Sequence, residues 1–189
     1  MSDVIKFNTE TQAFGISPGN FKCSGYGIAE LIKDIPNPRG IEIGCDVGDT
    51  TEFLLKTHQT LILDGVDPYE NYVDWNGNNL NERQVVYDNF MQRVKPFGTR
   101  FNLFREYSDD AAKEIADEHY DFIFIDGLHT YEQLTKDCAN YYSKVKTGGI
   151  FAGHDYNAIE GVRRAADEMA AGVGKKILKT ECDVWYWVK

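Results

Sequence analysis

The sequence predicts an α/β fold: a doubly wound, mostly parallel sheet with helices on both faces. Short apolar runs alternate with segments of helical periodicity along the chain, which is the pattern of strand–helix–strand units. The run YDFIFID at residues 120–126 contains four consecutive apolar side chains, so both faces of this strand must be covered. Polar residues follow several of the apolar runs, as they do where parallel strands end at a ligand site.

Length and composition limit the class of protein. The 189 residues are enough for one domain with a sizeable core, and the net charge of −10 argues against general binding to nucleic acid. No apolar run approaches the ~20 residues needed to span a membrane, and no secretory signal is visible. We therefore expect a cytoplasmic protein, with its four scattered cysteines as free thiols.

The first elements lead into a glycine-containing turn. Residues 1–24 are predicted to form an arm or cap, and residues 25–189 one domain. Apolar residues at i, i+3 and i+4 predict a helix at 25–33, which ends before two prolines. A buried strand at 41–43 precedes the turn, and a helix at 50–56 follows it.

Within this turn, Glu42, Gly44 and Gly48 have the spacing E-x-G-x-x-x-G. Gly44 lets the chain turn off the strand, and Gly48 leaves no side chain where the backbone passes a ligand. Asp49 and Glu52 fit a capping box at the helix start. Strand, turn and helix N-terminus together predict a nucleotide-type pocket, although such turns also occur in α/β proteins that bind nothing there.

Asp67 ends the second predicted strand, at 61–66, and lies 23 positions after Gly44. A carboxylate at this place suits a ribose diol, because it can accept hydrogen bonds from both hydroxyls. Taken alone, Asp67 could simply start a turn with Pro68. Together with the glycine turn at this spacing, the ribose role is favoured.

The middle of the chain begins with a polar loop at 70–79, in which Tyr72 and Trp75 either anchor the loop or form a substrate wall. The next elements are predicted as a helix at 80–94, a strand at 101–105 and a helix at 111–117. Tyr107 and Ser108 follow this strand, where they could contact a ligand. Ser108 or Asp109 is also a plausible N-cap of the helix.

The last part of the chain continues the alternation after the strand at 120–126. The predicted elements are a helix at 131–145, a strand at 150–153, a helix at 159–171, and strands at 177–180 and 184–188. The short link between the last two allows a hairpin, with an antiparallel final strand. Right-handed crossovers bring the strand ends to one edge. That edge collects Gly44, Asp67, Tyr107, Ser108, Asp126, His129, His154 and Asp155.

Asp126, His154 and Asp155 follow two of these strands and form a candidate metal site. Carboxylate oxygens with an imidazole can hold Mg²⁺, Ca²⁺ or Mn²⁺, which would lower the pKa of a substrate hydroxyl. The alternative is that they are polar residues that orient loops, and His154 could be a base instead of a ligand. His129 is the other candidate base, because neutral imidazole has about the right proton affinity. It could also be a local helix cap.

The motifs EIGCDVGDTT, GVDPY, YDFIFIDGLHTYEQLTKD and GGIFAGHDY, in this order, resemble those of class I S-adenosylmethionine-dependent methyltransferases. More narrowly, they are similar to the small O-methyltransferase-like branch with IDG-x-H-x-Y-E and GHDY motifs, methyltransferase family 24-like. The resemblance covers about residues 25–189. It implies a seven-stranded sheet of order 3-2-1-4-5-7-6 with strand seven antiparallel.

The resemblance also implies a donor site. Its cofactor-binding residues would be Glu42, Gly44, Asp46, Gly48, Asp67, Tyr107, Ser108 and Asp126. Among these, Asp67 would bind the ribose hydroxyls and Tyr107 and Ser108 would lie beside the adenine. Asp46 would lie near the sulfonium or amino group of the donor.

In metal-dependent members, residues that match Asp126 and the pair His154–Asp155 hold Mg²⁺. This chain departs from catechol-type relatives, which have Asp-Asn at the pair and a catalytic lysine where His129 stands. A histidine at position 129 in place of this lysine suggests a different substrate.

The leading hypothesis is methyl transfer from S-adenosylmethionine to a hydroxyl oxygen of a small molecule. Asp126, His154 and Asp155 would position this acceptor, directly or through a divalent ion, and His129 would take its proton. A nicotinamide-dependent oxidoreductase is a rival, but it needs a glycine where Asp46 stands. A non-catalytic protein that keeps the fold is another. We expect no nucleic-acid or membrane partner, and a homo-oligomer remains open.

Overall fold

The computed structural model describes residues 23–189, so the predicted arm at 1–24 lies outside the described residues except for its last two positions. The division between arm and domain stays a prediction. None of the helices within 23–189 has the length and apolar character to cross a membrane.

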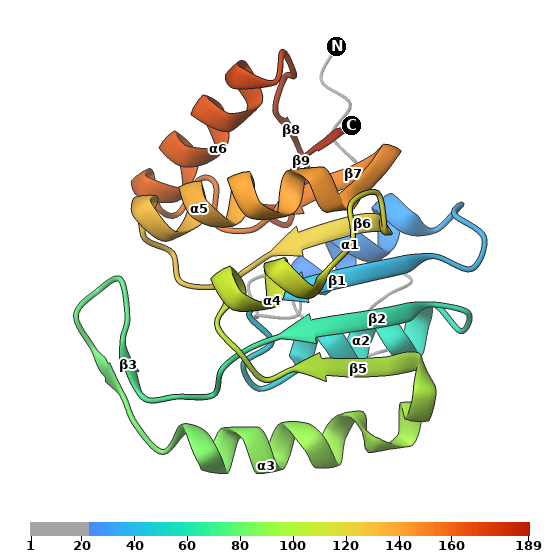
Figure 1. The fold of residues 1–189 in the computed structure, drawn as a ribbon, viewed down its shortest axis with the longest axis vertical. Coiled ribbons are helices and arrows are strands. Elements are labelled where there is room, and N and C mark those ends of the chain that lie inside the picture. Colours follow the sequence, from blue (N-terminus) through green and yellow to red (C-terminus); the bar gives the residue numbers. More distant parts are fainter. Residues whose placement is uncertain (1–22) are drawn as a thin grey trace.

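Seven strands form the central sheet, in the order β5-β2-β1-β6-β7-β9-β8 (Figure 1). They are β1 (Arg39–Ile43), β2 (Ile62–Val66), β5 (Phe101–Phe104), β6 (Tyr120–Ile125), β7 (Val145–Gly153), β8 (Leu178–Lys179) and β9 (Trp185–Val188). Counted along the chain within this sheet alone, the order is the expected 3-2-1-4-5-7-6. The first five strands are parallel and β9 is antiparallel to both of its neighbours, which confirms the predicted fold class.

Helices cover both faces of the sheet (Figure 1). They are α1 (Cys23–Ile32), α2 (Asp49–Thr57), α3 (Arg83–Val94), α4 (Ser108–Glu114), α5 (Tyr131–Tyr141) and α6 (Glu160–Gly172), with 3-10 turns at Lys95–Arg100 and Tyr142–Lys144. Along β6, Phe122 and Phe124 pack with α1 and α2, whereas Ile123 and Ile125 pack with α4, α5 and α6. The continuous apolar run therefore serves two cores, as predicted from its composition.

The structure corrects several element boundaries. The predicted helix at 80–94 begins only at Arg83, because Leu80 pairs with Tyr72 in a short antiparallel hairpin of β3 (Tyr72–Val73) and β4 (Asn79–Leu80). α4 begins at Ser108, and its N-cap is Tyr107 rather than a serine side chain. The helix predicted at 131–145 ends earlier, because Val145 belongs to β7 and pairs in the sheet.

The predicted capping box before α2 does not form. The N-cap is Gly48, at φ +84°, and no side chain caps the helix. Asp49 is instead the first helical residue, and both Asp49 and Glu52 pair with Arg93 of α3. Two acidic residues in the first turn still suit the positive end of the helix.

The cysteines also depart from the expectation. Cys45 and Cys138 are free and buried, but Cys182 is disulfide-bonded. The prediction of four free thiols is therefore wrong.

Candidate active site

Four loops start side by side because the sheet hydrogen bonds continue one residue past the strand ends. The backbone N–H of Gly44 donates to Val66 O at 2.8 Å, and that of Asp126 donates to Ile43 O at 2.8 Å. The N–H of Asp67 donates to Phe104 O, and that of His154 donates to Ile125 O. These bonds place the first residue of each loop at one rim, as predicted from the parallel topology.

Gly44 and Gly48 are both required for packing of the chain against itself. Gly44 has φ +90°, and a Cβ there would lie 2.2 Å from the carbonyl oxygen of Asp126. Gly48 has φ +84°, and a Cβ there would meet the ring of Phe90 at 2.7 Å. The turn predicted at Gly44 is confirmed. The ring of Phe90 fills the space that Gly48 leaves, and a ligand contact at the Gly48 backbone stays a prediction.

Asp67 is held in a fixed orientation below the rim. Its Oδ2 accepts the backbone N–H of Asp46 and its Oδ1 accepts that of Tyr69, both at 2.9 Å. Burial raises the pKa of Asp67, while the two N–H donors and the guanidinium of Arg83 lower it. Each carboxylate oxygen has a lone pair left, so this side chain can accept two further hydrogen bonds.

Glu42 lies in the interior and not on the surface of the rim. Only 1% of it is exposed, and its carboxylate accepts the hydroxyl of Thr51. Burial raises the pKa of Glu42 to about 8, against the effect of this hydrogen bond. Glu42 thus supports the start of α2 from beneath the glycine turn, and its contact with the donor stays a prediction.

Tyr107 and Ser108, predicted to lie beside an adenine, point to different partners. The Tyr107 hydroxyl donates to Glu70 at 2.7 Å and the ring is exposed. The Ser108 hydroxyl donates to Asp137 of α5 at 2.6 Å and accepts Nε2 of Gln133. Ser108 therefore joins α4 to α5, and only Tyr107 remains at the rim with an exposed surface.

This α4–α5 contact predicts a pH-dependent stability. Burial raises the pKa of Asp137 to about 6 in the folded protein, despite hydrogen bonds from Ser108 and Gln133. A raised carboxyl pKa contributes stability below pH ~4, and this contribution is lost as pH rises through about 6. Relative to Asp137→Asn, the wild type should lose about 2 kcal/mol of unfolding free energy between pH 4 and 7. Urea unfolding at both pH values measures this. Equal pH dependence in the two proteins would contradict the prediction, and the exposed Asp110→Asn serves as control.

The structure brings together Asp126, His129, His154 and Asp155. Nε2 of His129 lies 3.2 Å from Oδ1 of Asp126 and 2.9 Å from Oδ2 of Asp155. Nδ1 of His154 lies 3.3 Å from Oδ1 of Asp155 and 3.7 Å from Oδ1 of Asp126. Two imidazoles and two carboxylates thus alternate around one point, on loops that follow β6 and β7.

Charges within this cluster compensate one another. Burial alone would lower the pKa of His129, but hydrogen bonds and charges from Asp126 and Asp155 raise it to about 9. The pKa of His154 is raised to about 9 in the same way. The two imidazoles hold the pKa of Asp155 well below its usual range, although burial opposes this. The neighbouring carboxylates therefore favour the protonated form of both imidazoles.

The donor set also suits a divalent cation. One ligand atom each from Asp126, His154 and Asp155 lie within 4.8 Å of one another. His154 is oriented from outside the cluster, because its Nε2 lies 3.1 Å from the carbonyl oxygen of Cys182. Two oxygens and one nitrogen are a combination that Mg²⁺ or Mn²⁺ accepts. The residues present therefore fit such an ion.

Some residues at the rim have no signal in the sequence. Arg83 is the main one: it begins α3, is buried, and pairs with Asp46 at 2.6 Å. An arginine in the polar stretch before a helix looks like a solvated charge, and only the fold brings it to Asp46. Tyr69 likewise has no signal in the sequence, although its hydroxyl donates to the carbonyl oxygen of Asp46 at 2.9 Å.

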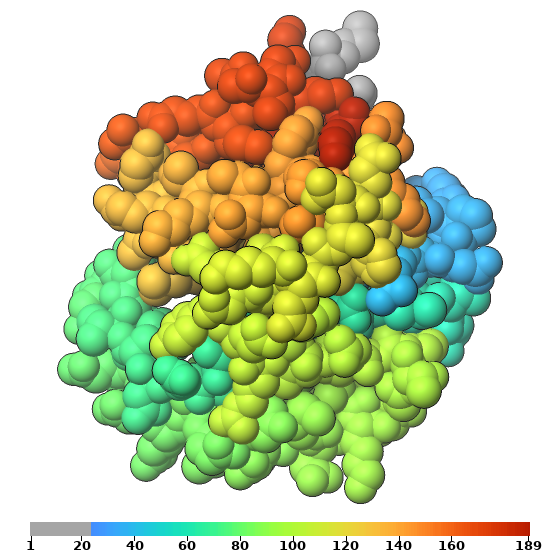
Figure 2. All heavy atoms as spheres, viewed as in Figure 1, coloured from blue at the N-terminus to red at the C-terminus, as the bar shows by residue number. Residues whose placement is uncertain are grey.

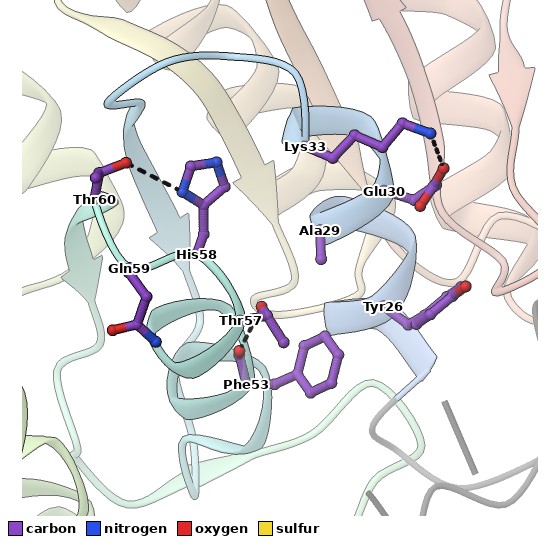
Figure 3. Close-up of a pocket in the computed structure, with 9 residues that line it drawn as sticks. All are labelled: Tyr26, Ala29, Glu30, Lys33, Phe53, Thr57, His58, Gln59 and Thr60. Atoms are coloured by element: carbon purple, nitrogen blue, oxygen red, sulfur yellow. Dashed lines mark hydrogen bonds and ion pairs between the residues drawn. The ribbon is translucent and has the colours of Figure 1, made fainter. Parts of the chain in front are cut away.

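A surface groove of about 430 Å³ lies elsewhere, between α1 and the end of α2 (Figure 3). Its lining includes Tyr26, Lys33, Phe53 and His58. Because α2 runs from the carboxyl end of β1 to the amino end of β2, His58 lies at the edge opposite the rim. None of the predicted site residues lines this groove.

Comparison with known proteins identifies the family of the chain. The methyltransferase domain family matches residues 41–156. None of the curated proteins matches the sequence significantly.

Several solved structures have a similar fold at low sequence identity. The O-methyltransferase NovP is 15% identical, with a TM-score of 0.66 over 88% of this chain and 77% of NovP. A Staphylococcus aureus protein whose name proposes caffeoyl-CoA O-methyltransferase activity is 14% identical, with a TM-score of 0.67 over 95% and 89%. A Corynebacterium glutamicum protein is 14% identical, with a TM-score of 0.64 over 95% and 86%. At such identities the likeness shows the fold alone.

Proposed function

Because the chain belongs to the methyltransferase domain family, we propose that it transfers a methyl group from S-adenosylmethionine to a hydroxyl oxygen of a small molecule. One observation carries this proposal: the oriented carboxylate of Asp67 and the cluster around Asp126 share one rim. The two halves touch at Gly44, which packs on the backbone of Asp126. A donor held by Asp67 would thus lie next to an acceptor held by the cluster.

The donor half of the rim suits a ribose. Asp67 presents two oriented oxygens with free lone pairs, which match a vicinal diol. The exposed ring of Tyr107 lies at the end of β5, and a planar base could stack on such a surface. A sulfonium is a cation, and the acidic rim of Asp46, Asp67 and Asp126 favours positive charge.

In the acceptor half, three groups of this chain have distinct tasks. Asp126 and Asp155 accept hydrogen bonds, so they can orient a hydroxyl toward the donor methyl. His129 lies between them and is the candidate base that removes the hydroxyl proton. The bound donor would supply a methyl group whose C–S bond is exchanged for a C–O bond, and His129 would take up the hydroxyl proton.

His129 must be neutral to accept this proton, and the two carboxylates oppose that. A divalent cation held by Asp126, His154 and Asp155 would supply positive charge in place of the proton on His129. This charge would lower the pKa of His129 and of a nearby hydroxyl. We therefore expect turnover to require an added divalent cation such as Mg²⁺ or Mn²⁺.

Donor binding can be measured before any acceptor is known. S-adenosylmethionine and S-adenosylhomocysteine should stabilise the protein by roughly 2.7 kcal/mol at a concentration of 100 Kd, whereas NAD should not. Asp67→Asn should weaken donor affinity about 10- to 100-fold, because charge-assisted hydrogen bonds to the ribose are lost. Thermal unfolding and calorimetry provide both measurements.

The matched control is Asp64→Asn on the same strand. Asp64 accepts the hydroxyl of Tyr120 at 2.8 Å and lies inside β2, before the rim loop begins, so its loss should lower stability but not donor affinity. A wild-type protein that ignores S-adenosylmethionine and is stabilised by NAD would overturn the proposal in favour of an oxidoreductase.

A further inference from the structure

Arg83 is a buried arginine that none of the steps above uses. Only 6% of it is exposed, and it begins α3 directly after the β3–β4 hairpin. Its Nη1 donates to Oδ1 of Asp46 at 2.6 Å, and its Nη2 lies 3.9 Å from Oδ2 of Asp67. One guanidinium therefore faces two carboxylates of the donor half of the rim.

Arg83 also holds the base of the hairpin. Its guanidinium carbon lies 5.6 Å from the ring centroid of Tyr69 and 5.7 Å from that of Tyr72, so it sits against both tyrosine rings. Its backbone N–H donates to the side-chain oxygen of Asn71 at 3.2 Å. Arg83 thus contacts the start of the segment that runs from Tyr69 to Arg83, through both its backbone and its side chain.

The hairpin itself lies beside the rim and presents apolar side chains to solvent. It projects past the carboxyl ends of β2 and β5 (Figure 1), and Figure 2 shows a hollow between its green residues and the yellow and orange residues that follow β6. Tyr72, Val73 and Trp75 are 41%, 55% and 49% exposed. Exposed aromatic side chains on the hairpin are available to a ligand.

Burial of this guanidinium is costly unless its partners stay in place. Its Nε is buried without a hydrogen-bond partner among the residues that the structure describes. Removal of the arginine would leave Asp67 buried and without its cation, and would free the hairpin from the tyrosine contact. The two consequences arise from one side chain.

We propose that Arg83 is a positioning residue that couples the donor site to the β3–β4 hairpin. It fixes Asp46 and Asp67 for the donor, and through Tyr69 and Tyr72 it orders the wall that carries Trp75. Donor binding at Asp46 and Asp67 should therefore stabilise the hairpin further, and an ordered hairpin should strengthen donor binding to the same extent. The inference rests on the proposed methyl donor and adds to it a positioning residue and a coupling between two parts of the site.

Trp75 provides a direct readout of hairpin order. The chain has three tryptophans, and Trp185 and Trp187 are buried in the core, so iodide quenching reports mainly on Trp75. S-adenosylhomocysteine should reduce this quenching in the wild type. Trp75→Phe should remove the donor-dependent change and so confirm its origin.

Two substitutions at Arg83 test the coupling. Arg83→Met should weaken S-adenosylhomocysteine affinity about tenfold or more, since a buried charge partner is removed, and should abolish the donor-dependent change in quenching. Arg83→Lys restores the charge but not the planar contact with two rings. It should recover most of the donor affinity while the quenching change stays absent, a separation that a general loss of packing would not give.

Arg105→Met is the matched control. Arg105 lies over the ring of Tyr87 at 3.9 Å and bonds Gln84, so it contacts α3 without reaching Asp46 or Asp67. It should leave donor affinity and the quenching change as in the wild type. If Arg83→Met and Arg83→Lys bind donor and change quenching as the wild type does, the role of Arg83 is overturned while the proposed function stands. If the wild type binds no donor, both fall.

Discussion

Asp126→Asn is expected to lower the turnover number for methyl transfer about 10³-fold, with a much smaller loss of donor affinity. The amide keeps the shape of the carboxylate but not its charge, so the cluster loses a counter-charge for both imidazoles and one candidate metal ligand. Donor binding should persist because Asp67 lies on another loop. The measurement is S-adenosylhomocysteine release with an acceptor found by screening phenols and sugars, together with calorimetric donor titration.

Two further variants sharpen this experiment. Asp121→Asn is the control, because Asp121 lies at the amino end of the same strand, where it pairs with Lys146. His129→Gln leaves the three candidate metal ligands in place, so it separates loss of the base from loss of the ion. Full turnover in Asp126→Asn would exclude the acceptor half of the proposed site.

Gly44→Ala is expected to lower the free energy of unfolding by about 3–4 kcal/mol. Its φ of +90° is strained for any side chain, and the new Cβ would lie 2.2 Å from the carbonyl oxygen of Asp126. The backbone of the β6 loop would have to move, and this movement would displace the acceptor cluster as well. Urea unfolding measures the loss of stability.

Gly148→Ala isolates the clash from the strain. Gly148 has φ +83°, but nothing lies within 4 Å of where its Cβ would be. This variant should therefore cost only about 1 kcal/mol. A similar cost at both positions would show that backbone strain alone, and not contact between the two loops, explains the need for Gly44.

The predicted site residues differ in how well the sequence placed them. Asp126, His129, His154 and Asp155 were predicted to meet, because each follows a strand whose end must lie at the same edge. Ser108 follows a strand end as well, but its hydroxyl donates a hydrogen bond to Asp137, which lies one helix further along the chain. Sequence position fixes where a backbone arrives, and it does not fix which partner a side chain finds there.

The cluster also shows why charge states need the structure. His129 was predicted as a neutral base, which is the normal state of an isolated imidazole near neutral pH. The fold places two carboxylates within 3.2 Å of its Nε2, and these raise its pKa to about 9. The carboxylates therefore favour protonated His129 until another positive charge, such as a divalent cation, lies beside them.

The sequence by itself determined the sheet, its strand order through the family resemblance, and the edge at which chemistry occurs. These follow from local patterns, since buried strands need consecutive apolar residues and parallel strands need crossovers. Only the tertiary structure decided that Arg83 reaches Asp46, that Gly48 makes room for Phe90, and that Leu80 pairs in a hairpin. Some of these contacts join residues that are far apart in the chain. Others decide between local conformations of nearly equal energy, and the packing of the whole core selects one of these conformations.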